Sequence, residues 1–416
     1  MHKIYPDVIT RFLHEHERLI LSEEKEMPLV IEAKKTTELP FLQQFLRTHS
    51  TDLLEDISRY GAVLLRGFDV TSDEDFENTV LCIKGLRGIR ETFMSEEGRI
   101  HAGHSKYVLY TNAVYKTGGT LYLGGFHNEN YYVPDVPAYI SFCCLKPSLQ
   151  GGETGLINMA NVYQFLDNSL KEKLEKNSFF VTKWLVSEVA KRYGVSTDAI
   201  EKICHEFDLP IVGKQKDKFI LMYKPSVLEH PTTKRKSLFI NTFETPSVNK
   251  VLRQSFSKDY KGSDWFFHRL VWKLPSFIFK TLEVIYIMCA SFFYSPKEAL
   301  QILQTKLNTR RASSKKDHLP SFYDVKVGDC FDEQHIQELA KLMRTYYSSC
   351  LWKKGDILLV DNRQVMHAGM PGKGPRLVRA MICNPLDMKY SFQEQGVIDG
   401  KERFTDSIGC LLSSKQ

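Results

Sequence analysis

The sequence predicts an α+β protein built around a β-sandwich or β-barrel. Short runs rich in β-branched and aromatic residues recur between glycine and proline turns over residues 107–157, and again near the C-terminal end. Stretches with apolar residues at helical spacing precede and follow the first group of runs. The regular alternation of strand and helix that is typical of a doubly wound parallel sheet is missing. These three observations together favour the α+β class.

The N-terminal region, residues 1–55, is predicted to be helical. Phe41, Phe45, Leu46 and Leu53 are apolar residues at helical spacing. Residues 1–26 are rich in charged side chains and lack the apolar core of a signal peptide, so we expect a surface helix there.

The predicted core follows, over residues 56–245 and 319–390, with a C-terminal tail over 391–416. A β-rich run closed by glycine predicts a strand over 61–68, and Thr71 to Glu74 have the spacing of a helix-capping box. The other predicted strands are 107–110, 120–123, 138–145, 155–157, 219–223, 237–240, 356–361 and 377–383, and the other predicted helices are 161–174 and 196–207.

Residues 246–318 form a basic, aromatic helical insertion in this core. They contain 13 Lys and Arg against 5 Asp and Glu. Within them, the mostly apolar run 276–294 is interrupted by Lys280 and Glu283, whereas a membrane span needs ~20 residues with few or no charges. We therefore expect a buried or interfacial helix that serves as a lid, a dimer contact or a membrane-surface contact. Residues 309–317 are expected to form a mobile loop.

The overall composition limits the possible partners and location. A net charge of +6 on 416 residues is too small to argue for a nucleic-acid partner. The nine cysteines are scattered without a CxxC pair, which is typical of reduced thiols in a cytoplasmic protein.

The residues that best indicate chemistry are His127, Glu129 and His367. His127 and Glu129 are two positions apart, so on an extended strand their side chains leave the same face and can occupy adjacent positions on one metal ion. His367 follows a strongly predicted strand and is the best candidate for a third ligand. Two imidazoles and one carboxylate are the ligand set of Fe(II) sites that leave positions open for O2. Arginines beyond His367 can bind a carboxylate in a bidentate manner.

Five stretches of the chain resemble the taurine dioxygenase/clavaminate synthase-like family of Fe(II)- and 2-oxoglutarate-dependent oxygenases. They are residues 60–68, 126–129, 151–154, 224–241 and 354–379. The likeness is greatest to the branch that hydroxylates amino-acid units in nonribosomal peptide and siderophore pathways. The resemblance implies a double-stranded β-helix (jelly-roll) core with flanking helices, which the insertion interrupts. One family feature is missing, because Ile240 stands where the family has a tryptophan before Asn241, and this puts substrate contacts there in doubt.

The resemblance also implies roles for individual residues. The metal triad falls on His127, Glu129 and His367, and the hydroxyl that binds 2-oxoglutarate falls on Thr154. For the cosubstrate arginine we favour Arg379, which precedes a small residue as in the family. Arg376 is the alternative and could otherwise bind substrate or be a surface cation. The two differ by an odd number of positions and face opposite sides of a regular strand.

The implied reaction is the hydroxylation of an amino acid or a related small substrate, free or tethered to a carrier protein. It uses Fe(II), 2-oxoglutarate and O2 and releases succinate and CO2. A carboxylate at Glu129 favours hydroxylation over halogenation, with desaturation or ring closure as further outcomes. A homo-oligomer is possible. Two alternatives stay open: a non-catalytic jelly-roll protein that binds a membrane or a protein through residues 246–318, and a Zn2+ hydrolase on the same triad.

Several nearby residues have simpler interpretations. Thr154 could be an ordinary turn residue, and we interpret Glu153 as a structural hydrogen-bond acceptor and Asp361 as the anchor of the loop before His367. Residues interpreted as surface or turn histidines are His101, His104 and His230, and residues that line either a pocket or the core are Tyr110, Thr111 and Asn112.

Overall fold

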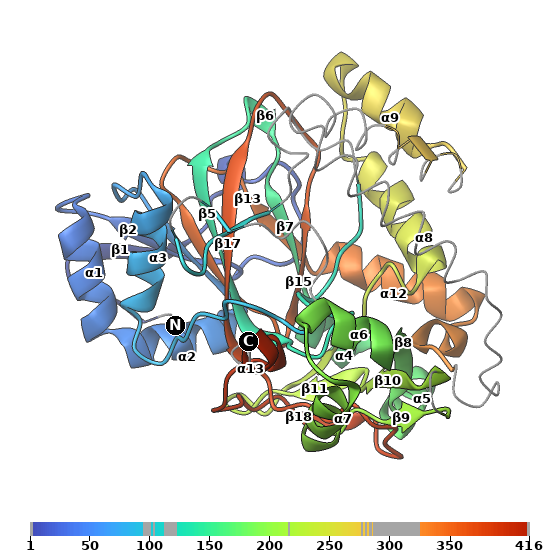
Figure 1. The fold of residues 1–416 in the computed structure, drawn as a ribbon. Coiled ribbons are helices and arrows are strands. Elements are labelled where there is room, and N and C mark those ends of the chain that lie inside the picture. Colours follow the sequence, from blue (N-terminus) through green and yellow to red (C-terminus); the bar gives the residue numbers. More distant parts are fainter. Residues whose placement is uncertain are drawn as a thin grey trace.

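The computed structural model describes residues 3–94, 101–102, 105–111, 123–214, 217–275, 278, 281, 282, 285 and 325–413. Within these residues, two β-sheets pack face to face and helices cover their outer faces (Figure 1). This arrangement is of the predicted α+β class.

The larger sheet has seven strands in the order β1-β2-β3-β14-β5-β17-β4. Their bounds are β1 (Val8–Phe12), β2 (Leu29–Ala33), β3 (Ala62–Arg66), β4 (Leu109–Tyr110), β5 (Pro137–Lys146), β14 (Ile357–Asp361) and β17 (Leu377–Pro385). Strands β2 and β3 are parallel, and the other neighbours are antiparallel. The predicted strands over 61–68, 138–145, 356–361 and 377–383 are confirmed as β3, β5, β14 and β17.

The smaller sheet faces this one and consists of β13 (Tyr347–Cys350), β7 (Thr154–Asn158) and β15 (Val365–Gly369), all antiparallel. Side-chain alternation along the strands separates the layers. In β14, Leu358 and Val360 pack between the two sheets, whereas Ile357 and Leu359 pack on the helix side. In β7, Leu156 faces the space between the sheets and Ile157 faces the other way.

Helices cover both outer faces. On the larger sheet lie α1 (Leu39–Thr48), α2 (Ser50–Tyr60) and α3 (Asp73–Leu81), and on the smaller sheet lie α4 (Met159–Phe165), α5 (Asn168–Lys176), α8 (Pro246–Ser257) and α12 (Glu333–Thr345). Helix α8 begins the insertion and packs against α12, so this part of the insertion belongs to the core.

Smaller elements complete the described chain. Two small sheets consist of β8 (Phe179–Leu185), β10 (Phe219–Lys224) and β9 (Ile211–Val212), and of β12 (Lys236–Leu238), β11 (Val227–Glu229) and β18 (Val397–Asp399), while β6 (Gln150–Gly151) pairs with β16 (Gly372–Lys373). The other helices are α6 (Val186–Tyr193), α7 (Thr197–Glu206), α9 (Phe266–Trp272) and α13 (Ile408–Ser413). The 3-10 turns are η1 (Glu15–Glu17), η4 (Ser263–Trp265) and η6 (Val327–Cys330).

The prediction of a helical N-terminal region over 1–55 is wrong in its first half. Residues 8–12 form β1, which pairs with β2, and helices begin only at Leu39. Of the charged side chains that indicated a surface helix, that of Arg11 lies on this edge strand and bonds Glu32 on β2 and Glu17 in the following turn. Strand pairing between distant segments therefore overrides the local charge pattern.

Three further expectations are refined. The predicted helix 161–174 is two helices, because Asp167 caps a new helix at α5. The capping box lies one residue later than predicted, on Ser72 and Asp75. The C-terminal tail 391–416 contributes β18 to a sheet and buries Ile408 and Leu412 of α13.

The described part of the insertion 246–318 contains the helices α8 and α9 and the 3-10 turn η4, joined by short non-helical segments. Most of the apolar run 276–294, the loop 309–317 and most of the predicted strand 120–123 lie outside the described residues. Among the described helices, none combines the length and the apolar character that crossing a bilayer requires.

Candidate metal centre

Backbone pairing holds His127 next to His367. The N–H of His127 donates to the carbonyl of His367 at 3.1 Å, and the N–H of His367 donates to the carbonyl of His127 at 2.9 Å. His367 lies in the middle of β15, whereas His127 forms an isolated bridge after two glycines with positive φ, Gly124 and Gly125. The extended strand expected around His127 is thus reduced to one bridging residue.

Glu129 is positioned by Asn362 at the end of β14. The Glu129 N–H donates to Asn362 Oδ1 at 2.6 Å, and Asn362 Nδ2 donates to the carbonyls of Glu129 at 3.2 Å and Pro137 at 2.8 Å. The intervening Asn128 points the other way and donates to the Asn362 carbonyl at 2.7 Å. The expectation that positions 127 and 129 share a face therefore holds without a regular strand.

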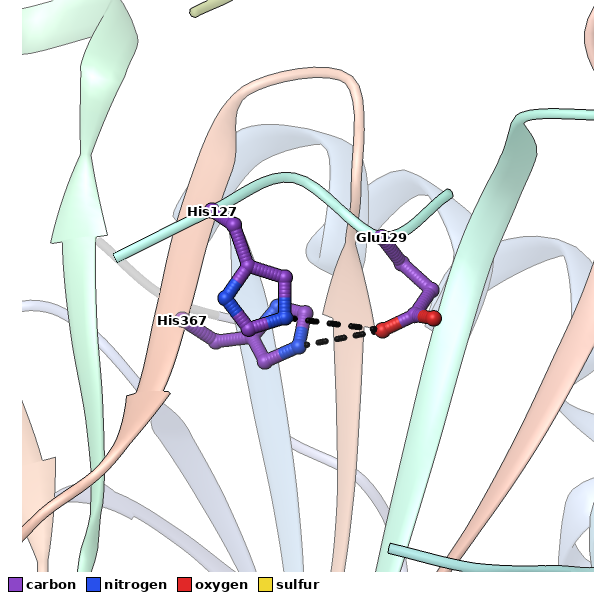
Figure 2. A group of neighbouring side chains, drawn as sticks. All are labelled: His127, Glu129 and His367. Carbon is purple, nitrogen blue, oxygen red and sulfur yellow. Dashed lines mark ion pairs between the residues drawn. The ribbon is translucent and has the colours of Figure 1, made fainter. Parts of the chain in front are cut away.

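The three side chains converge on one point (Figure 2). Glu129 Oε2 lies 3.8 Å from His127 Nε2 and 3.4 Å from His367 Nε2, and one ligand atom from each residue lies within 4.8 Å of the others. His127 Nδ1 lies 2.9 Å from the Gly125 carbonyl, a contact that leaves Nε2 unprotonated when Nδ1 donates. Glu129 and His367 are buried and His127 is half-buried, so the group opens on one side.

A buried lysine holds the loop that follows Glu129. Lys224 Nζ donates to the carbonyls of Asn130 at 3.1 Å, Tyr131 at 2.6 Å and Val133 at 2.8 Å. Burial lowers the pKa of Lys224 well below its usual value, and Asp135 opposes this shift. Three backbone carbonyls satisfy all three donors of the ammonium group, which fixes the path of the loop.

A second buried network holds the loop before His367. Asp361 accepts from His230 at 2.7 Å, from Arg363 at 2.8 Å and from Gln364 at 3.1 Å. Burial raises the pKa of Asp361, but Arg363 and His230 outweigh this effect and hold it well below its usual range. The anchoring role predicted for Asp361 is confirmed. His230, interpreted as a surface or turn residue, does lie at a turn, where its ring accepts from the N–H groups of Thr232 and Thr233. It is not on the surface, because its side chain is 1% exposed and pairs with Asp361.

Thr154 and Arg376 lie together at one end of β7. Thr154 begins β7 and is two residues from Leu156, which pairs with His367, so Thr154 and His367 face the same side of the smaller sheet. Arg376 Nη1 donates to the carbonyls of Gly152 and Glu153, directly before Thr154.

Arg379 lies on the other face of the larger sheet. Its Nε donates to Asp73 of α3 at 2.7 Å, and its guanidinium lies over the ring of Tyr110 at 4.2 Å from the ring centre. Ala380, next in the chain, packs between the sheets. The structure therefore brings Arg376, and not the favoured Arg379, to the side of the sheet that carries His367.

The remaining candidates have other surroundings. Thr111 Oγ1 donates to the Val378 carbonyl at 3.1 Å, and His101 is half-buried in a bridge to Leu109, while Asn112 and His104 lie outside the described residues. No other side chain in the described part of the chain donates to the Glu153 carboxylate, and a hydrogen bond with its own backbone N–H only partly offsets the effect of burial on its pKa.

Sequence reasoning missed the positioning roles of Asn362, Lys224 and Asn241. Asn241 forms a backbone bridge to His127, and its neighbour Thr242 donates twice to the Phe126 carbonyl. All three lie in the stretches that carry the family resemblance, but only the folded chain places them beside the metal ligands.

Comparisons with known proteins agree with this geometry. The chain matches the family model described as "Taurine catabolism dioxygenase TauD, TfdA family" over residues 24–264, more than half of its length. The match includes His127, Glu129 and Thr154 and ends before His367.

Individual relatives are distant. A clavaminate synthase-like protein of Arabidopsis thaliana is 23% identical over 376 residues, which cover 87% of this chain and 94% of that protein. The dapdiamide synthesis protein DdaC of Enterobacter agglomerans is 26% identical over 129 residues, which cover 31% of this chain and only 36% of DdaC.

Solved structures are less similar still. PvcB from Pseudomonas aeruginosa is 12% identical with a TM-score of 0.43, over 92% of this chain and 94% of that one. AAD-2, solved in complex with Mn(II) and N-oxalylglycine, is 14% identical with a TM-score of 0.41, over 90% of this chain and 96% of that one.

Proposed function

The chain belongs to the TauD/TfdA family of taurine catabolism dioxygenases, and from this premise we propose that it hydroxylates an unactivated carbon of an amino acid or a small amino-acid-derived substrate. The family consists of dioxygenases that depend on Fe(II) and consume 2-oxoglutarate and O2, so this enzyme has the same cofactor and cosubstrates. One partial relative is named for dapdiamide synthesis, and a role in small-molecule synthesis is therefore part of the proposal.

The observation that carries the proposal is the convergence of His127, Glu129 and His367. Two neutral imidazoles and one carboxylate suit Fe(II), and three ligands from one side leave the opposite positions for cosubstrate and O2. Fe(II), when bound, would supply the activation of O2 for oxidative decarboxylation of 2-oxoglutarate to succinate and CO2. The protein would hold the metal and keep its surroundings dry, since Phe142 packs on His367 with ring centres 5.1 Å apart.

For the distal carboxylate of 2-oxoglutarate we propose Thr154 and Arg376. Both are buried, and they meet at the end of β7 on the side of the sheet that carries His367. A guanidinium beside a hydroxyl is well suited to a carboxylate. Arg379, which pairs with Asp73, is proposed to hold α3 against the larger sheet instead.

Further parts of the proposal concern the fold and the setting. The two facing sheets are proposed to be the double-stranded β-helix of the family, with residues 246–318 inserted between its strands. A cytoplasmic location is proposed because the eight described cysteines are all free thiols. A carrier-tethered substrate, a membrane-surface contact and a homo-oligomer stay predictions.

The test is succinate formation from 2-oxoglutarate by the purified full-length chain with added Fe(II), followed by a mass-spectrometric screen of amino acids for an added oxygen. We expect succinate release that a chelator abolishes and Fe(II) restores. His367→Ala should abolish it, whereas His16→Ala, a change at an exposed histidine, should not. A folded, iron-loaded protein that forms no succinate with any substrate would support the non-catalytic alternative, and Zn2+-dependent hydrolysis would support a hydrolase.

A further inference from the structure

Helix α9 of the insertion presents an apolar face to the surface of the molecule. Phe266, Phe267 and Leu270 are 64%, 59% and 54% exposed. Phe266 and Phe267 lie four and three positions before Leu270, so the three side chains share one side of the helix. The helix lies at the periphery of the molecule, at the upper right of Figure 1. Clustered apolar side chains of this kind, unlike isolated ones, indicate an interaction site.

The opposite face of α9 is already packed. His268 and Trp272 are buried, and so is Trp265 directly before the helix. The Tyr260 ring meets those of Trp265 and Trp272, with ring centres 4.8 and 5.1 Å apart. Arg269 Nη1 donates to the Tyr260 carbonyl at 2.5 Å. The core therefore uses one side of α9, and this packing does not account for the exposed side.

The strand pair β6 and β16 supports this segment. Lys373 Nζ of β16 lies 3.2 Å from Asp264 Oδ1 and 5.6 Å from the centre of the Trp265 ring. The same ring packs on β6, since a Cβ atom at Gly151 would lie 3.1 Å from Trp265 Cη2. Leu149 directly precedes β6, bonds the Lys373 carbonyl through its N–H at 2.9 Å and is 86% exposed. The phenyl rings of α9 therefore stand on a fixed support, which exposes an apolar side chain of its own.

The described run 246–275 of the insertion carries an excess of positive charge. It contains six Lys and Arg and two Asp. Both acidic side chains pair with cations outside the insertion, Asp259 with Arg344 of α12 and Asp264 with Lys373 of β16. The acidic residues of this run are thus already engaged by other cations.

Exposed lysines lie on both sides of α9 in the chain. Lys273 directly follows the helix and is three positions after Leu270, so it shares the side that carries the apolar face. Lys258 and Lys261 are exposed in the segment between α8 and η4. The surface around α9 is therefore both apolar and positively charged.

An anionic lipid bilayer complements both features. Its headgroups are negatively charged and its acyl region takes up apolar side chains, so a helix with aromatic residues and lysines binds at the interface between them. A second copy of the chain fits less well, because a symmetric contact would bring the lysines of both copies together. Since none of the described helices can cross a bilayer, the contact would be made at its surface.

We propose that the α9 face, formed by Phe266, Phe267, Leu270 and Lys273, docks on the surface of an anionic lipid bilayer. The apolar side chains enter the headgroup region, and Lys273 and the lysines before the helix meet the lipid phosphates. Such a peripheral contact is compatible with the proposed cytoplasmic location, because the cytoplasmic leaflet is anionic. This inference goes beyond the proposed function and does not depend on it.

The test is co-sedimentation of the purified full-length chain with vesicles of phosphatidylcholine and phosphatidylglycerol in equal parts, compared with vesicles of phosphatidylcholine alone. We expect binding to the anionic vesicles that weakens as salt is added, because salt screens the lysines. The double change Phe266→Ser and Phe267→Ser should lower the partition coefficient at least ~10-fold, because it removes two phenyl groups from the contact. Lys273→Gln should lower it about fivefold, the contribution of one lysine near an anionic surface.

Two matched variants serve as controls. Phe404→Ser, at a phenylalanine that is 91% exposed, and Lys389→Gln, at an exposed lysine, should bind the vesicles like the wild type. All variants change exposed side chains, and an unchanged Tm would show that they fold.

Four outcomes are decisive. Absence of wild-type binding to the anionic vesicles, or binding that the double change leaves unaltered, overturns the inference. Equal binding to both kinds of vesicle overturns it too, since the lysines would then contribute nothing. A dimer in size-exclusion chromatography that the double change dissociates, without vesicle binding, assigns the face to a second copy of the chain. Loss of succinate formation with intact vesicle binding counts against the proposed function alone.

Discussion

Replacing Asn362 with alanine is expected to lower the free energy of unfolding and the metal affinity together. Asn362 is 0% exposed, and its side chain bonds the N–H and carbonyl of Glu129 at 2.6 and 3.2 Å and the carbonyl of Pro137 at 2.8 Å. Alanine leaves these three backbone groups without that partner. A buried unsatisfied group costs ~1–3 kcal/mol, and the loop can relax in part, so we expect a loss of about 3 kcal/mol in total.

The metal affinity should fall because Glu129 loses the side chain that fixes its backbone. Loss of a residue that orients a metal ligand typically costs ~10–100-fold in affinity. The free energy of unfolding would be measured by urea denaturation of the metal-free protein, and the affinity by calorimetric titration with Mn(II). Asn168→Ala, at an exposed position in α5, is the matched control and should change neither quantity.

The two measurements separate a stabilising role from a positioning role. If folded Asn362→Ala binds Mn(II) as tightly as the wild type, Asn362 does not position Glu129 for the metal. If its unfolding free energy is unchanged, the three hydrogen bonds contribute no net stability and the reasoning from burial fails.

Three other predictions follow from the buried charges. Arg376→Met should raise the KM for 2-oxoglutarate at least ~10-fold in steady-state kinetics, because it removes a charge-assisted bond, whereas Arg379→Met should chiefly lower Tm. The reverse result would reassign the cosubstrate arginine. Arg66→Met should cost ~3–5 kcal/mol in urea denaturation, because it leaves buried Asp356 without its cation and Glu17 with Arg11 alone. Because the pKa of Glu153 rises to about 7 in the folded protein, wild-type stability should fall between pH 5 and 8, and Glu153→Gln should raise Tm at pH 8 but not at pH 5.

Features set by neighbouring residues were determined by the sequence itself. Short runs rich in β-forming residues between turns predicted β14 and β17, and the spacing of His127 and Glu129 predicted two side chains on one face. These predictions depend only on backbone geometry over a few residues. The chemistry of the candidate site, two imidazoles and a carboxylate, follows from residue types in the same way.

Only the tertiary structure decided how distant segments meet. Residues 8–12 form a strand because β2 is available to pair with them, which no local pattern records. The choice between Arg376 and Arg379 depends on which side of β17 faces the smaller sheet. Their odd spacing in the sequence puts the two side chains on opposite sides of the strand, but it does not show which side faces inward. His230 is buried because Asp361, 131 residues away, offers it a partner. The physical reason is common to all three: pairing, facing and burial are set by contacts between residues far apart in the chain.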